Sequence, residues 1–429
     1  MSLQFITGNS GNGKTKYLFN RIVKEAKANP RDNYLVIVPE QFTMQTQRQL
    51  VDLSENKAIM NIDVLSFKRL AYRVFDELGI TNLTVLEETG KNLVLRKLAA
   101  QEADKLGVIG RNLNRIGYIS EVKSLLSELV QYNISPEELG RYIASGRLSD
   151  TLSDKLKDVL VLYEAFEKFM QDKYITAEEI LNVLSNVAEE SAILRNSVIA
   201  FDEFTGFTPI QNQLIKKLFV ISKKIYVTLT IDCREDIFKS RGMQELFDMP
   251  KRTVKSLTEM AAFYGIEVEG PIILDKNYRL AENEELSFME QQLFRKRRCS
   301  FKKVPKHIHI DCLRDPKQEL TKIARRINEL VRNEKLRYRD IAIVTGDVNI
   351  YAGYVREIFD KYNIPYFIDA TQEILFHPFI EFIRSIPDIA IQNFSADAVF
   401  RFLRCGFSEL LDSEIDVLEN YVLACGVRG

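Results

Sequence analysis

Cysteine and histidine are scarce in this sequence, and their placement argues against the usual metal and redox motifs. The five cysteines are widely separated and form no C-x-x-C pair; they are Cys233, Cys299, Cys312, Cys405 and Cys425. This pattern is typical of free thiols in a reducing compartment. Two of the three histidines, His307 and His309, alternate along a predicted strand, which is only a weak indication of a metal site.

Long apolar runs and a strong net charge are also missing. No apolar run approaches the roughly 18 residues that span a bilayer, and the N-terminus lacks the charged and apolar regions of a signal peptide. We therefore expect a cytoplasmic protein without membrane contact. The formal net charge is −1, so any contact with nucleic acid has to come from local basic patches.

The composition is that of a globular protein with ample material for a core. Of the 429 residues, 46% are hydrophobic and 28% are charged. A chain of this length is too long for one ordinary domain, so two or three domains are expected.

The first fifteen residues carry the most specific motif. An apolar run, Leu3 to Thr7, leads into G-N-S-G-N-G-K-T, after which apolar residues recur with helical spacing. This is the G-x-x-x-x-G-K-[ST] phosphate loop between a strand and a helix. The glycines allow the backbone N–H groups to point inward, and the helix presents its positive end to the same anion. The predicted nucleotide-binding residues are Gly8, Asn9, Ser10, Gly11, Asn12, Gly13, Lys14 and Thr15.

Lys14 and Thr15 have separate predicted roles. Lys14 would reach the β- and γ-phosphates of ATP, and the Thr15 hydroxyl would bind the accompanying Mg²⁺. A chance match in a glycine-containing loop is the alternative, and the strand-to-helix context disfavours it. Whether the nucleotide is hydrolysed is a separate question.

Strands and helices alternate along the first part of the chain. Tyr34 to Val38 is apolar throughout, as expected of a parallel strand covered on both sides, and Ile59 to Leu65 is the next strand candidate. A helix begins after it at Ser66, whose hydroxyl can cap the N-terminus. The pattern predicts an α/β nucleotide-binding core. From about Glu87 to Glu190 the alternation of strands and helices stops and apolar residues recur with helical spacing only, which predicts a helical insertion.

The α/β pattern resumes with Ser197 to Phe201, followed by Asp202 and Glu203. A hydrophobic strand that ends in Asp-Glu is the usual form of the second ATPase motif. Asp202 would hold Mg²⁺ through water, and Glu203 would orient the attacking water. A solvated acidic strand end is the alternative. The next strand, Lys224 to Ile231, ends at Asp232, so we expect this acid to lie near the phosphates as well.

A second α/β unit is predicted further along the chain. Its strands are Ile308 to Leu313, Asp340 to Val344 and Pro365 to Ile368, with helices between them, and the last sixty residues are helical. The expected organisation is a first α/β domain at 1–270 with an insertion at about 87–192, the start of a second domain at 271–372, and a truncated helical insertion at 373–429.

Two features are candidates for DNA contact. The segment Phe294 to Lys306 is rich in cations, including Arg297, and can grip phosphates; a solvated connector is an equally good interpretation. The aromatic residues Phe42, Phe204 and Phe207 follow core strands and could stack on bases. They could equally be core residues beneath the loops.

Several longer motifs resemble one family, the B subunits of AddAB-type ATP-dependent helicase/deoxyribonucleases of Gram-positive bacteria. Besides the N-terminal phosphate loop, the motifs are V-P-E-Q at Val38–Gln41, L-S-F-K-R-L at Leu65–Leu70, F-D-E-F-T-G-F-T-P-I-Q at Phe201–Gln211, H-P-F-I-E-F-I at His377–Ile383, V-F-R-F-L-R-C-G at Val399–Gly406 and L-E-N-Y-V-L-A at Leu418–Ala424. The layout is similar to superfamily 1 helicases. The resemblance therefore implies two RecA-like P-loop domains with parallel sheets, each with a helical insertion, the second truncated.

The resemblance also implies partners and chemistry. Asn277-Tyr278-Arg279 is similar to the N-Y-R motif of those helicases, in which the arginine reaches the γ-phosphate. In this family the B subunit pairs with an AddA-type motor subunit, processes single- and double-stranded DNA ends for recombinational repair and scans for a recombination hotspot sequence. Its nuclease domain and iron–sulfur cluster are C-terminal, and we expect both to lie outside this sequence.

The sequence departs from an active motor in three places. The seven residues before the phosphate loop leave no room for the glutamine that reads adenine in active relatives. Asp202-Glu203-Phe204-Thr205-Gly206 replaces D-E-x-Q-D, and Thr230-Ile231-Asp232-Cys233-Arg234 replaces G-D-x-x-Q. These changes put the coupling of hydrolysis to DNA movement in doubt. An autonomous translocase and a nucleotide-stiffened scaffold for the A subunit remain the alternatives.

Overall fold

The computed structural model describes residues 1–80, 84–108, 110, 117–146, 148–170, 174–295, 299–370, 374 and 376–427. It consists of two compact units, Met1–Ile308 and His309–Gly429. Each unit is described by itself.

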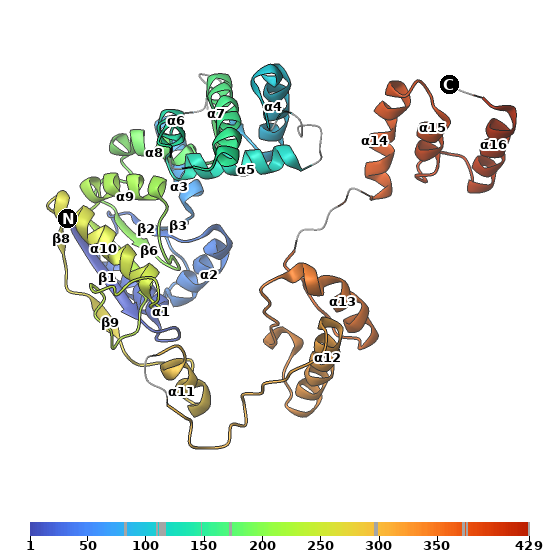
Figure 1. The fold of residues 1–429 in the computed structure, drawn as a ribbon. Helices are drawn as coiled ribbons and strands as arrows, with labels where there is room; N and C mark the ends of the chain where they lie inside the picture. The colour runs from blue at the N-terminus through green and yellow to red at the C-terminus, as the bar shows by residue number, and fades with distance from the viewer. Residues whose placement is uncertain are drawn as a thin grey trace. The chain divides into compact units, whose positions relative to one another are not determined.

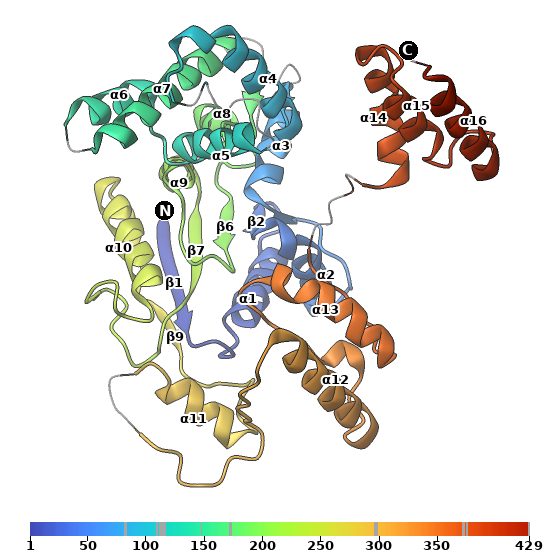
Figure 2. The ribbon, with the colours of Figure 1, turned by 45° about the vertical axis from the view of Figure 1, so that its right-hand side comes forward.

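The first unit is built on a seven-stranded sheet of parallel strands (Figures 1 and 2). The strand order is β3-β2-β6-β7-β1-β8, and β9 also pairs with β1. The strands are β1 (Ser2–Gly8), β2 (Tyr34–Ile37), β3 (Ile62–Leu65), β6 (Val198–Phe201), β7 (Lys224–Thr230), β8 (Glu267–Val268) and β9 (Ile272–Leu274). The predicted α/β fold class is therefore confirmed.

Helices cover both faces of this sheet, which explains why its strands are apolar at consecutive positions. Alternate side chains enter different cores: Phe5 packs with one set of helices and Ile6 with the other. On the Ile6 face lie α1 (Lys14–Ala28) and α2 (Thr43–Leu53). The Phe5 face is covered by α3 (Phe67–Leu78), α8 (Ile180–Val187), α9 (Pro209–Ile221) and α10 (Asp248–Phe263).

A helical region with a core of its own interrupts the sheet between β3 and β6. It contains α4 (Glu88–Gln101), α5 (Tyr118–Gln131), α6 (Pro136–Ala144) and α7 (Asp150–Met170). Two short parallel strands, β4 (Val85–Leu86) and β5 (Ile175–Thr176), pair where the chain enters and leaves this region. The helix α11 (Glu284–Gln292) follows β9 and completes the first unit.

The second unit is helical in its described residues. Helices α12 (Pro316–Asn333) and α13 (Val348–Lys361) pack around Leu320, Ile327 and Phe359, and α14 (Pro378–Ile391), α15 (Ala396–Leu403) and α16 (Asp412–Cys425) follow. The three strands predicted here are wrong, because described residues 309–370 contain no strand. Ile310, Val344 and Phe367 are 95%, 92% and 88% exposed. A strand exists only through hydrogen bonds to a partner, and these segments pair with none in the described part.

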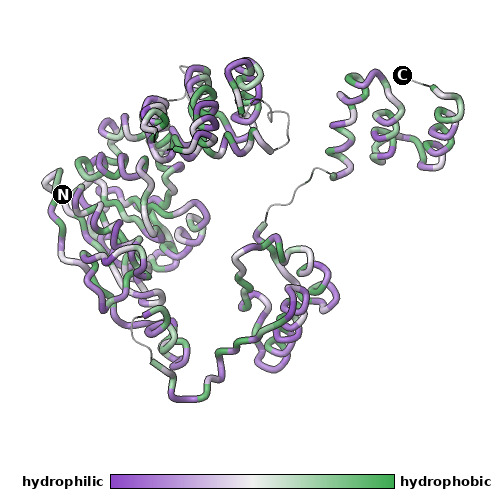
Figure 3. Tube along the Cα trace, viewed as in Figure 1, coloured by the Kyte–Doolittle hydropathy of each residue, from purple (hydrophilic) through white to green (hydrophobic). Residues whose placement is uncertain are grey.

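Hydrophobic and hydrophilic residues are interspersed along the helices (Figure 3). Among the described residues no helix is both long enough and apolar enough to cross a membrane.

Candidate nucleotide-binding site

The glycine-rich loop lies between the end of β1 and the start of α1, as the motif predicts. Gly11 and Gly13 have φ values of +88° and +78°, a left-handed conformation that other residues rarely adopt. A Cβ atom on Gly11 would lie 2.8 Å from the Asn277 Oδ1 atom, so the loop has no room for a side chain there. Backbone geometry and close packing both require glycine at this position.

Helix α1 begins directly after the loop and no side chain caps it. Its N-terminus is therefore a positive helix end with backbone N–H groups available to an anion. This is the usual arrangement of a phosphate-binding helix.

Lys14, the first residue of α1, folds its side chain back over the loop. Its ammonium group donates to the carbonyl oxygens of Gly8 and Asn9, both at 3.0 Å. Burial lowers the pKa of Lys14; the Glu203 and Asp202 carboxylates oppose this shift and the Arg279 guanidinium adds to it. The Lys14 ammonium group is thus held inside the loop, where it could contact a bound phosphate group.

Asp202 lies at the end of β6 and is 1% exposed. Its Oδ1 atom accepts a hydrogen bond from the Thr228 hydroxyl on the neighbouring strand β7. The Oδ2 atom is buried without a hydrogen-bond partner in the described structure. Burial raises the pKa of Asp202, and the Glu203 carboxylate adds to that rise, whereas the bond from Thr228 opposes it. An unpartnered buried carboxylate oxygen is the kind of group that a cation or an ordered water satisfies.

Glu203 has a φ of +64°, which is uncommon for a residue with a side chain. The Thr15 hydroxyl donates to its Oε1 atom at 3.3 Å. Thr15, Asp202 and Glu203 therefore offer hydroxyl and carboxylate oxygens, the ligand type that Mg²⁺ prefers. Among the described residues no group of three or more His, Cys, Asp or Glu side chains could enclose a metal ion.

Residues far along the chain cover the loop from the other side. The Asn277 side chain donates to the Ser10 carbonyl at 2.9 Å, and the Tyr278 backbone N–H donates to the Gly11 carbonyl at 3.0 Å. The Arg279 guanidinium lies 3.3 Å from the Ser10 hydroxyl. Arg279 therefore belongs to the same compact unit as the phosphate loop that it contacts.

These groups surround a cavity of about 730 Å³. Its walls include Lys14, Thr15, Asp202, Glu203 and Arg279. The motif analysis did not single out several further lining residues, among them Gln49, Asp52 and Thr228. A signal existed for Thr228, because it is a polar residue within an apolar strand; no local pattern distinguishes Gln49 or Asp52.

Asp232 lies elsewhere, which corrects the expectation that it joins the phosphate site. It is absent from the cavity lining, and its carboxylate is paired with the guanidinium groups of Arg234 and Arg295 at 2.6 and 2.9 Å. Burial would raise its pKa, but these two arginines dominate and lower the pKa to about 2. The acid at the end of β7 is therefore a structural anchor.

The aromatic residues considered for DNA stacking are partly buried. Phe204 and Phe207 form a cluster with Phe67 and Phe201, with ring centroids 5.3 to 6.3 Å apart. Phe42 packs against the core beneath α1 and α2. Arg297 lies outside the described residues. DNA contact by these four residues stays a prediction.

The fold and the site define a class: an α/β protein whose parallel sheet carries a glycine-rich strand–loop–helix junction facing a lysine, a threonine and two acids. Sequence comparison then identifies the family. Residues 5–290 match the family described as "ADDB, N-terminal", and the chain belongs to that family. The resemblance drawn from the motifs is therefore confirmed.

Curated relatives are named as the B subunit of an ATP-dependent helicase/deoxyribonuclease. The protein of Lachnoclostridium phytofermentans is 39% identical over 434 residues, which cover 100% of this chain and 38% of the relative. Those of Clostridium tetani and Clostridium acetobutylicum are each 34% identical over 100% of this chain, which matches 38% and 37% of their lengths. The chain thus spans less than two fifths of each of these relatives.

Proposed function

We propose that the first unit binds ATP with Mg²⁺ at Gly8–Thr15, as part of the B subunit of an ATP-dependent helicase/deoxyribonuclease. The observation that carries this proposal is the convergence of Lys14, Thr15, Asp202 and Arg279 on one cavity. The names of the relatives, which include ATP dependence, support it.

Each residue has a role that follows from its chemistry. The loop N–H groups and the N-terminus of α1 bind the phosphates, and Lys14 and Arg279 neutralise their charge. Thr15 and Asp202 would hold Mg²⁺, which supplies further charge neutralisation when bound. Glu203 would accept a hydrogen bond from a water beside the terminal phosphate, the role of the acid in the second ATPase motif.

Recognition of the base needs a group beside the loop that can contact a planar ring. Tyr278 lines the cavity and is 65% exposed, and the Lys276 ammonium lies 5.0 Å from the centroid of its ring. An exposed aromatic ring beside the loop provides a stacking surface for a base. We therefore assign base binding to Tyr278.

The altered motifs after β6 and β7 favour a retained nucleotide clamp over an autonomous motor. Asp232 supports this interpretation, because Arg234 and Arg295 occupy its carboxylate. In the family role that we propose, an AddA-type subunit supplies the motor. The complex acts in the cytoplasm on single- and double-stranded DNA ends during recombinational repair, and this chain takes part in the search for the hotspot sequence.

Nucleotide titration tests the proposal. A fluorescent ATP analogue is titrated into the wild-type chain and into Lys14→Ala, with and without Mg²⁺ and single-stranded DNA. Loss of the charged hydrogen bonds of Lys14 is expected to weaken binding by about 10- to 100-fold. Lys24→Ala is the matched control, because Lys24 lies on the same helix and is exposed. Binding that is absent in the wild type, or equal in Lys14→Ala, contradicts the proposal.

A further inference from the structure

Helix α11 reaches the phosphate loop through one side chain. The Asn9 amide nitrogen donates to the Glu290 carboxylate at 2.6 Å. The Asn9 amide oxygen accepts from the Cys233 backbone N–H at 2.9 Å, so both ends of this buried amide are bonded. The same residue uses its backbone carbonyl to accept from Lys14. Asn9 therefore connects Glu290 on α11 to the lysine of the loop.

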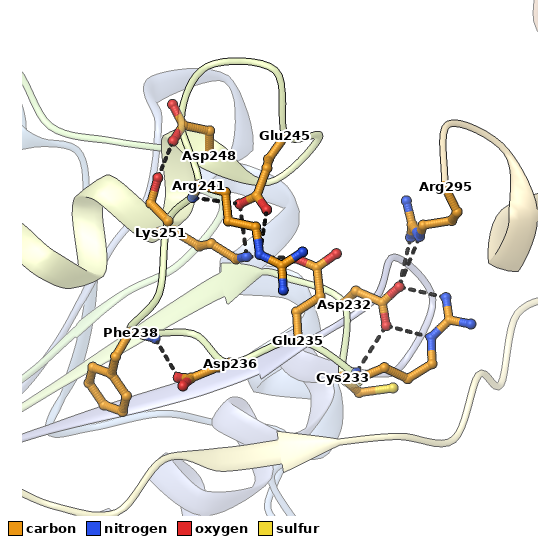
Figure 4. A network of polar contacts seen from close by, with 12 residues as sticks. Asp232, Cys233, Glu235, Asp236, Phe238, Arg241, Glu245, Asp248, Lys251 and Arg295 are labelled. Carbon is orange, nitrogen blue, oxygen red and sulfur yellow. Dashed lines mark hydrogen bonds and ion pairs between the residues drawn. The ribbon is translucent and has the colours of Figure 1, made fainter. Parts of the chain in front are cut away.

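Two arginines tie α11 and the residues after it to the end of β7. Arg295 bonds the buried Asp232 carboxylate through Nε at 3.0 Å and Nη2 at 2.9 Å, and its guanidinium lies 5.0 Å from the Phe247 ring centroid. Arg234 bonds Asp232 and also donates to the Gln291 carbonyl at 3.1 Å. Figure 4 shows Arg295 directed at Asp232 beside Cys233. The chain is thus anchored directly after Glu290, at Gln291 and at Arg295.

The loop that follows Asp232 is itself held in place. The buried Lys251 ammonium pairs with Glu235 at 2.6 Å and with Glu245 at 3.2 Å (Figure 4). The Ser240 hydroxyl donates to Asp248 at 2.5 Å, and Asp248 also pairs with Arg252. The loop that anchors α11 is therefore itself held by buried polar contacts of the first unit.

We propose that Glu290 is a positioning residue of the nucleotide site, which holds Asn9, and through Asn9 the Lys14 ammonium, in the arrangement that accepts phosphates. This inference rests on the proposed nucleotide binding. It adds a residue outside the phosphate-loop motif, from a helix 281 positions away from Asn9. The bond requires an acceptor at position 290, and a carbonyl oxygen can serve as well as a carboxylate.

Two substitutions show whether position 290 needs a hydrogen-bond acceptor or a negative charge. Glu290→Gln keeps an oxygen that accepts from Asn9, and Glu290→Met keeps the length of the side chain without an acceptor. We expect Glu290→Met to weaken the binding of the fluorescent ATP analogue about tenfold, and Glu290→Gln to stay within about threefold of the wild type. Glu284→Met is the control, because Glu284 lies on the same helix and pairs only with the exposed Lys303 among the contacts described.

A second measurement keeps the positioning role separate from nucleotide binding. Amide hydrogen exchange of residues 9–13, measured without nucleotide, is expected to be several-fold faster in Glu290→Met than in the wild type or Glu290→Gln. If Glu290→Met leaves both exchange and affinity at wild-type values, the positioning role is overturned. If exchange responds but the wild type binds no nucleotide, Glu290 does position the loop and the proposed function is what fails.

Discussion

Thr228 lies on β7 and Asp202 directly follows the neighbouring strand β6, and the Thr228 hydroxyl donates to the Asp202 carboxylate, which is almost completely buried. The other oxygen of Asp202 has no partner within the described structure. The pair places one satisfied and one unsatisfied oxygen at the floor of the cavity. The hydrogen bond from Thr228 reduces the free-energy cost of burying the carboxylate, and the second oxygen remains available to bind a cation.

Thr228→Val removes the donor and keeps the shape of the side chain. We expect the free energy of unfolding at pH 7 to fall by about 1–3 kcal/mol, because the buried carboxylate loses its hydrogen bond. Urea unfolding measures the change. Thr258→Val is the control, since the Thr258 hydroxyl is buried without a partner in the described residues and its removal should cost nothing. Equal losses in the two variants would contradict this account.

Gly11→Ala places a Cβ atom 2.8 Å from Asn277 in a backbone with a φ of +88°. The left-handed strain costs about 1–2 kcal/mol of stability, and the clash displaces Asn277 and Arg279 from the loop. We therefore expect the affinity for the ATP analogue to fall at least about tenfold. Gly79→Ala is the matched control: Gly79 has a φ of +68° and no atoms within 4 Å of an added Cβ. It should show the strain in urea unfolding and bind nucleotide normally.

Asp232→Ala tests the anchor at the end of β7. It leaves the nearly buried Arg295 without its carboxylate, so we expect the free energy of unfolding at pH 7 to fall by about 3 kcal/mol. The pKa of Asp232 is lowered to about 2, so its stabilisation is present above the ordinary pKa of an aspartate and is lost as the pH falls toward 2. The difference between the wild type and the variant should therefore shrink between about pH 4 and pH 2. A difference that is independent of pH in urea unfolding would show that packing, and not the ion pairs, stabilises this anchor.

Lys251→Met tests the network in Figure 4. Lys251 is 4% exposed, and its removal leaves Glu235 and Glu245 without their shared cation. We expect a loss of about 3 kcal/mol in urea unfolding, because one partner of a buried ion pair is removed. Lys255→Met, which removes an exposed lysine from an ion pair with Glu259 on the same helix, should change stability by less than about 0.5 kcal/mol. Comparable effects in the two variants would argue against a clamp at Lys251.

Local patterns predicted the first unit better than the second. Continuous apolar runs such as Tyr34–Val38 indicated buried parallel strands, and β2 confirms this because its neighbours pair with it. The run Asp340–Val344 is also largely apolar and was predicted as a strand on the same grounds. Val344 is nevertheless 92% exposed and pairs with no strand in the described structure. Strand propensity is a property of a segment, whereas a strand needs a partner. Periodicity alone could not distinguish the two cases.

By itself the sequence determined the strand–loop–helix junction, because glycine spacing and a following lysine specify a phosphate loop over a few residues. It also determined the family, through motifs spread along the chain. The family resemblance pointed to Arg279, but only the tertiary structure showed the contacts themselves: Asn277 and Arg279 bond the loop, Glu290 bonds Asn9, and Asp232 pairs with two arginines. Most of these contacts join residues from about 60 to more than 260 positions apart. The exception is the ion pair of Asp232 with Arg234, two positions away, which takes up the carboxylate that was expected near the phosphates. Only the packed sheet brings such groups within hydrogen-bond distance, so no local pattern in the chain encodes them.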